Sequence, residues 1–105
     1  MMNDLYISKQ LEELILGWCE FETAEDTFWK TVEESGELLQ ALNKFRQGKW
    51  DIDKAQEETA DLMLCLLVLS YQIGQKEVMR NLEAKLKRMD RRYEAALIKN
   101  KKKGK

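Results

Sequence analysis

The chain has 105 residues, of which 35% are charged, and it contains neither histidine nor proline. A chain of this length is expected to form one domain. Without histidine, the protein cannot use a Ser-His-Asp or Cys-His nucleophile, nor bind zinc through histidine ligands. The formal net charge of −1 argues against a strongly basic nucleic-acid-binding protein, so we do not expect nucleic acid as a partner.

The composition also indicates a location. The N-terminal segment lacks the basic start and apolar stretch of a signal peptide, and the longest apolar run, residues 62–69, is too short to span a bilayer. The only cysteines, Cys19 and Cys65, form no CxxC motif. These features fit a reducing cytoplasm, so we expect a cytoplasmic protein with no membrane partner.

Apolar residues recur every three or four positions along most of the chain, which predicts helices, and no segment alternates as a strand would. The first predicted helix spans about residues 4–20. Thr23, with an acid three residues later, can cap a second helix over about residues 24–47, which Gly48 would end.

Two further helices follow. Asp51 or Asp53 can cap a third helix over about residues 53–73, which Gly74 would end, and the fourth runs over about residues 76–97. The Lys-rich residues 99–105 contain no acid, and we predict a disordered tail there. Residues 1–98 are then expected to form a single all-α domain.

The third predicted helix is unusual because residues 62–69 make it apolar on every side. The other helices of so short a chain can hardly enclose it, so we expect a second copy of the chain to cover it. The predicted fold is therefore all-α: a four-helix bundle-type subunit whose apolar third helix is buried in a homo-oligomer, a homodimer or homotetramer. A monomeric bundle is the alternative.

Two acidic clusters lie on successive predicted helices. In each, two acids stand three residues apart, so each pair shares one helix face; the pairs are Glu34 with Glu37 and Glu58 with Asp61. Both pairs lie in line with the apolar face of their helix, so packing along these faces would bring the carboxylates together. Such crowded negative charges need cations. Oxygen ligands without histidine or cysteine favour Mg²⁺, with Mn²⁺ as an alternative.

The competing interpretation is that lysines and arginines of a neighbouring helix neutralise these acids as ordinary salt bridges. The order of the acids nevertheless resembles a family signature. Glu33-Glu34-x-x-Glu37 followed by Glu58-x-x-Asp61 is similar to the motif of the MazG-like all-α nucleoside triphosphate pyrophosphohydrolases. The stretches EESGELLQALNKFRQGKWD and EETADLMLCLLVL resemble the phage-type branch. Lys85-Leu86-x-Arg88 and Arg92-Tyr93 resemble the family's late basic helix, and the resemblance covers about residues 28–93.

The resemblance implies a Mg²⁺-dependent hydrolase that cleaves a nucleoside triphosphate between its α and β phosphates, giving a monophosphate and pyrophosphate. It implies four metal ligands, which are Glu34, Glu37, Glu58 and Asp61. Their neighbours Glu33 and Glu57 lie about 100° round the helix from these ligands. As candidate catalytic residues, either could support the ligands or orient the attacking water.

Basic residues are candidates for binding the phosphates. Lys85, Arg88 and Arg92 stand three and four residues apart, so they share a face of the fourth predicted helix and could neutralise the β and γ phosphates. Lys44, which follows the first acidic cluster, is a further candidate. The alternative for each of them is a solvated surface cation.

Two other functions stay open. The run ADLMLCLLVL also resembles the phosphoribosyl-ATP pyrophosphohydrolases of histidine synthesis, although the chain lacks the N-terminal segment expected of that branch. The other alternative is a non-enzymatic helical interaction module with a basic, nucleic-acid-binding tail. The sequence does not name the preferred base or sugar.

Overall fold

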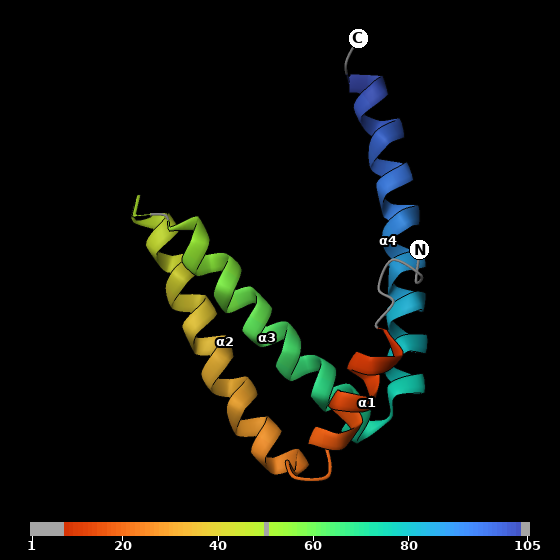
Figure 1. The fold of residues 1–105 in the computed structure, drawn as a ribbon. Helices are drawn as coiled ribbons and strands as arrows, with labels where there is room; N and C mark the ends of the chain where they lie inside the picture. Colours follow the sequence, from red (N-terminus) through yellow and green to blue (C-terminus); the bar gives the residue numbers. More distant parts are fainter. Residues whose placement is uncertain (1–7, 50, 104–105) are drawn as a thin grey trace. The chain divides into compact units, whose positions relative to one another are not determined.

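The structure, a computed structural model, describes residues 8–49 and 51–103. Over these residues the chain forms helices and no strand, which confirms the all-α prediction (Figure 1). The helices are α1 (Lys9–Trp18), α2 (Ala24–Arg46), α3 (Ile52–Ile73) and α4 (Gln75–Lys103).

The helix starts follow from side-chain caps. Ser8 accepts a hydrogen bond from the backbone N–H of Leu11 at 3.2 Å, so α1 begins at Lys9. Positions 4–7 of the predicted first helix lie outside the described residues. At α2, Thr23 and Asp26 form the predicted capping box, in which each side chain accepts from the other residue's backbone N–H at 3.1 Å.

Local residues also determine where α2 and α3 end and where α3 begins. Gly48 and Gly74 have φ values of 76° and 120°, a region that favours glycine, and they stop α2 and α3 as predicted. Of the two candidate caps for α3, Asp51 is the one used, because its side chain accepts from the backbone N–H of Lys54 at 3.1 Å. Asp53 lies within the first turn.

The described chain divides into two compact units. The first ends at Gly74 and contains α1, α2 and α3; α2 and α3 pack side by side as a helical hairpin, and α1 packs on α3 (Figure 1). The second contains α4. The arrangement of all four helices as one bundle within a single domain stays a prediction.

The expectation of a disordered tail is wrong for residues 99–103, because α4 continues as a helix to Lys103. Lysine is a good helix former, and positive charge is favourable near a helix C-terminus. No glycine interrupts this segment before Gly104, which lies outside the described residues together with Lys105.

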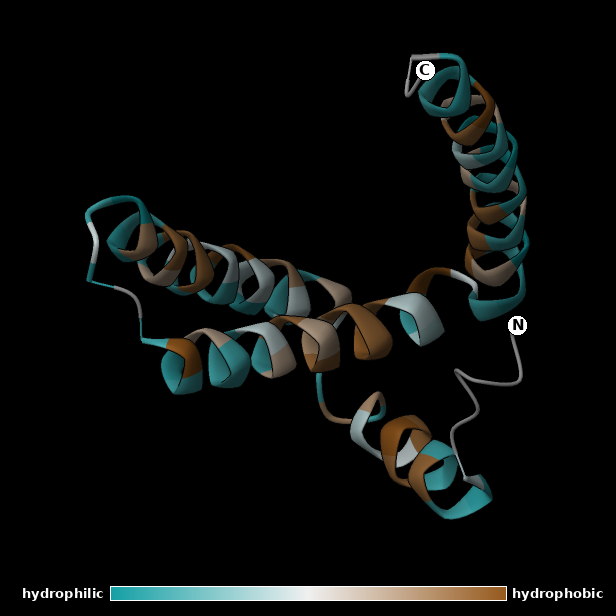
Figure 2. Ribbon diagram, turned by 90° about the horizontal axis from the view of Figure 1, so that it is seen from above, coloured by the Kyte–Doolittle hydropathy of each residue, from teal (hydrophilic) through white to brown (hydrophobic). Residues whose placement is uncertain are grey.

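The core of the α1–α3 unit is thin. Its buried apolar side chains are Ile15, Ala41, Ala55 and Val68. The C-terminal half of α3 is strongly hydrophobic (Figure 2), yet Met63 and Leu64 are 57% and 55% exposed. None of the described helices combines the length and the apolar character needed to cross a membrane.

Candidate metal centre

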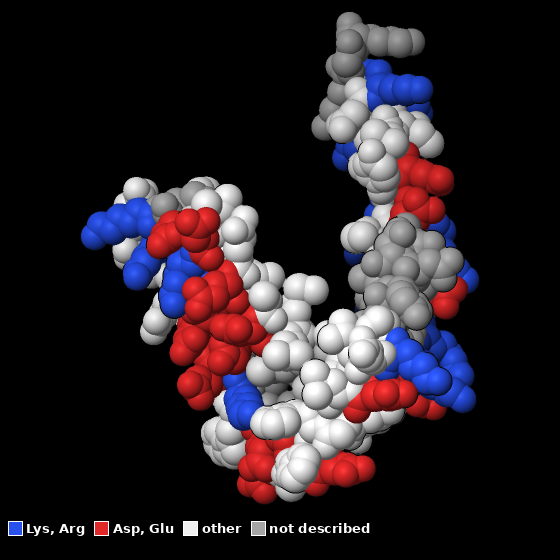
Figure 3. Space-filling view, viewed as in Figure 1, with Lys and Arg blue, Asp and Glu red and all other residues white. Residues whose placement is uncertain are grey.

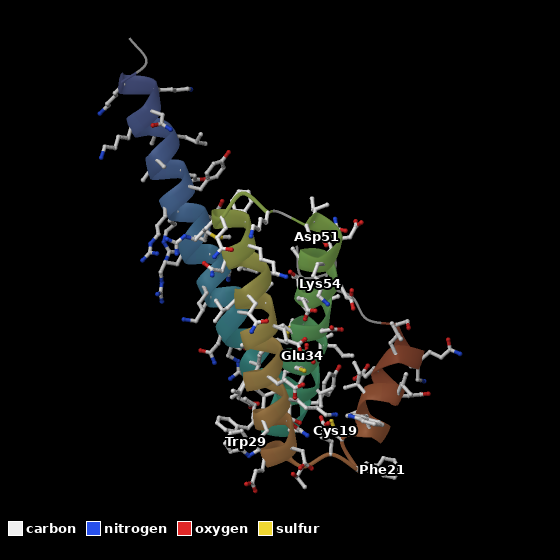
Figure 4. All side chains as sticks on the ribbon, turned by 90° about the vertical axis from the view of Figure 1, so that its left-hand side faces the viewer. Cys19, Phe21, Trp29, Glu34, Asp51 and Lys54 are labelled. Carbon is white, nitrogen blue, oxygen red and sulfur yellow. The ribbon has the colours of Figure 1, made fainter. Side chains whose placement is uncertain are left out.

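The packing of α2 against α3 gathers carboxylates from both helices. Glu34 and Glu37 stand three residues apart on α2, and Glu58 faces them from α3. One carboxylate oxygen from each of these residues lies within 4.8 Å of the others. Figure 3 shows acidic side chains concentrated along this helix pair, and Figure 4 labels Glu34 on α2. The predicted meeting of the two acidic stripes therefore occurs at these residues.

A second group overlaps the first. Glu57, Glu58 and Asp61 of α3 also present carboxylate oxygens within 4.8 Å of one another, so Glu58 belongs to both groups. All the ligands that the resemblance implied thus lie in two groups joined at Glu58. Glu57, predicted as a candidate catalytic residue and not as a ligand, can reach the same space. Glu33 is exposed and belongs to neither group.

Glu58 is the most deeply placed of these acids. Its side chain is only 2% exposed, and its Oε1 forms an ion pair with the Nζ atom of Lys54 at 2.9 Å. Among the described residues, neither Oε2 of Glu58 nor Oε2 of Glu34 has a hydrogen-bond partner, although both atoms are buried. A buried carboxylate oxygen without a donor is costly, and a bound cation would remove that cost.

The shifts in pKa reflect this crowding. Burial, and then repulsion by Asp61 and Glu58, raise the pKa of Glu34. The pKa of Glu37 is raised first by its hydrogen bond with Glu58, because a protonated Glu37 can donate where two carboxylates would repel. The ammonium of Lys54 holds the pKa of Glu58 below its usual range. Without metal, Lys54 therefore offsets part of the negative charge, and the crowding favours the protonated forms of Glu34 and Glu37.

The donor set fits a hard divalent cation. The groups offer carboxylate oxygens alone, from two helices, and two buried oxygens lack a donor from the described residues. Mg²⁺ and Mn²⁺ prefer such ligands, and Mg²⁺ commonly uses a few carboxylates together with substrate phosphates. Glu34, Glu37, Glu58 and Asp61 would hold the ion.

Lys54 is the residue that our sequence reasoning missed. It lies four residues before Glu58 on α3, and this spacing is the signal that could have identified it. Unlike Lys54, the basic residues predicted to bind phosphate form no described ion pair with the acids of the site. Lys44 is exposed on α2, seven residues beyond Glu37. α4 carries the other three on one exposed face, and they are Lys85, Arg88 and Arg92.

Comparisons of the chain with protein-family models, with curated proteins and with solved structures find no match.

Proposed function

We propose that the protein is a Mg²⁺-dependent nucleotide pyrophosphohydrolase. It would cleave a nucleoside or deoxynucleoside triphosphate between the α and β phosphates. Water adds to the α phosphorus, the bond to the bridging oxygen breaks, and a monophosphate and pyrophosphate leave. The observation that carries the proposal is the carboxylate site between α2 and α3, with its two buried oxygens that lack a donor from the described residues.

The proposed roles of the acids follow from their positions. Glu34, Glu37, Glu58 and Asp61 bind the cation, which offsets the charge of the triphosphate and lowers the pKa of the attacking water. Glu57 is exposed and reaches Asp61 and Glu58, so it is better placed than Glu33 to accept a proton from that water.

The sequence resemblance supports the choice of reaction, because the acids occur in the order and spacing of the MazG-like motif. It also supports a phosphate-binding role for the exposed basic face of α4, formed by Lys85, Arg88 and Arg92. These cations would cover the departing pyrophosphate, whose charge grows as the bond to the α phosphate breaks.

We also propose that the working form is a homodimer or homotetramer, located in the cytoplasm. Large apolar side chains project from α3 in the single chain, where Met63, Leu64 and Leu66 are all about half exposed or more. Large apolar side chains exposed together on one helix are typical of an interface between protein chains. A second copy would cover them and enlarge the thin core.

The test is a panel of ribonucleoside and deoxyribonucleoside triphosphates incubated with the protein and Mg²⁺, with the products separated by chromatography. We expect monophosphate and pyrophosphate from at least one nucleotide, and none when a chelator replaces Mg²⁺. Including phosphoribosyl-ATP in the panel distinguishes the histidine-synthesis alternative. Turnover of no member of the panel would contradict the proposed activity.

A further inference from the structure

The ion pair between Lys54 and Glu58 is uneven in its exposure to water. The side chain of Lys54 is 52% exposed, whereas that of Glu58 is 2% exposed, and their Nζ and Oε1 atoms lie 2.9 Å apart. An exposed ammonium can return to water at little cost, but a buried carboxylate cannot leave its site. Lys54 is therefore the exchangeable member of the pair.

Lys54 also faces more than one acid. Its charge interacts with Glu57 and Glu37 as well as with Glu58, so it borders both carboxylate groups. The other ion pair described in the α1–α3 unit joins Lys30 to Glu22, neither of which belongs to the carboxylate groups. Lys54 thus stands where a divalent cation would compete with it for the same oxygens.

We propose that Lys54 is an internal counterion of the metal site, which holds Glu58 in the metal-free protein and which the divalent cation must displace. This inference rests on the proposed function, because it assumes that the acids bind a metal ion. It makes Lys54 a residue that sets metal affinity. The lysine stabilises the empty site, and its positive charge weakens binding of a second cation beside it.

The first experiment measures Mg²⁺ and Mn²⁺ binding to the full chain by isothermal titration calorimetry at about pH 8, where carboxylates are ionised. We expect Lys54→Met to bind either ion about 10-fold more tightly than the unsubstituted protein, because a neighbouring positive charge is gone. Lys54→Arg keeps the charge and should bind within about 2-fold of the unsubstituted protein. Lys9→Met, on α1, removes a lysine from a helix that contributes nothing to the acidic groups and should change nothing.

The possible results separate the two proposals. Equal or weaker binding by Lys54→Met, with normal binding by the unsubstituted protein, overturns the role of Lys54 and leaves the metal site standing. If neither the unsubstituted protein nor any variant binds a metal ion, both the metal site and the role of Lys54 are overturned. Binding by Lys54→Met alone would mean that the cation cannot displace Lys54, which overturns the proposed exchange.

A second measurement needs no substitution and so does not depend on the variant folding. Lysines of the unsubstituted protein are labelled with an amine-reactive reagent, with and without saturating Mg²⁺, and the peptides are quantified by mass spectrometry. Displacement from Glu58 should raise the labelling rate of Lys54 several-fold, while that of Lys9 stays constant. An unchanged rate at Lys54 in the Mg²⁺-bound protein would overturn the inference.

Discussion

The hydroxyl of Thr27 donates a 2.8 Å hydrogen bond to Oε2 of Glu22, and both side chains are buried. Lys30 pairs with the other carboxylate oxygen at 2.5 Å, and the side-chain amide of Gln72 donates to the backbone oxygen of Glu22 at 2.8 Å. The Gln72 contact attaches the turn before α2 to the end of α3, and the Thr27 and Lys30 contacts hold Glu22 against the N-terminal part of α2. They thereby help to set how α2 aligns along α3, which in turn places Glu34 beside the acids of α3.

Thr27→Val keeps the shape of the side chain but removes the donor to a buried carboxylate. We expect the free energy of unfolding to fall by about 1–3 kcal/mol, the cost of leaving a buried polar group unsatisfied. Urea denaturation measures this loss. Thr31→Val is the matched control. Among the residues that the structure describes, the Thr31 hydroxyl donates only to the backbone oxygen of Thr27, so its loss should cost less. Equal losses for the two variants would contradict the importance of the Glu22 contact.

Glu34→Gln should stabilise the metal-free protein while abolishing Mg²⁺-dependent hydrolysis. The pKa of Glu34 is raised in the folded state, so folding favours its protonated form. Its contribution to the free energy of unfolding therefore falls as the pH rises from about 4.3 through the folded pKa. Thermal denaturation with a chelator should show a higher Tm for Glu34→Gln at neutral pH, and a difference that vanishes in acid.

The control for this prediction is Glu33→Gln, which removes an exposed acid beside Glu34 that belongs to neither carboxylate group. It should change the Tm less and retain metal dependence. An unfolded Glu34→Gln protein would mean that Glu34 is needed for the fold itself.

Much of the fold could be predicted from local signals. The Thr23 cap and the glycine stops act within a few residues, so α2 was predicted to within a residue of its observed bounds, Ala24–Arg46. The helical state of residues 99–103 is not predicted, because a run of like charges is typical of disordered segments, whereas lysine itself favours helices.

The candidate site could be predicted only in part. The acids of α2 and α3 follow the apolar face of their helices, so packing of those faces was enough to bring them together. The four-residue spacing shows that Lys54 can pair with Glu58, but the importance of that pair depends on the burial of Glu58, which arises from tertiary packing. The roles of the α4 cations likewise depend on how α4 is arranged in the active protein.

Arg88→Ala should lower kcat/KM. The expected loss of transition-state stabilisation is about 1.5–3 kcal/mol, the range for a hydrogen bond to a charged group. The reason is that the proposed clamp on the departing pyrophosphate loses one cation. Steady-state kinetics measure the effect, and Mg²⁺ affinity without nucleotide should hardly change. Lys101→Ala removes a lysine near the end of the same helix and should leave turnover intact. Unchanged kinetics for Arg88→Ala together with reduced turnover for Lys101→Ala would mean that the end of α4, and not Arg88, binds the phosphates.

The oligomer can be tested through α3. Light scattering at micromolar concentration should show a dimer or tetramer, because single chains leave the apolar side chains of α3 in water. Leu64→Glu places a charge on that surface and should shift the population toward monomer. A monomeric unsubstituted protein would contradict the proposal.

The most direct test of the metal site compares Mn²⁺ binding by the unsubstituted protein and by Glu58→Gln. Electron paramagnetic resonance measures the binding. Glu58 belongs to both carboxylate groups and has a buried oxygen with no donor among the described residues, so the site depends on it more than on any other acid. We predict saturable Mn²⁺ binding by the unsubstituted protein and its loss in a folded Glu58→Gln variant. Equal binding by both proteins, or binding by neither, would contradict a metal centre between α2 and α3.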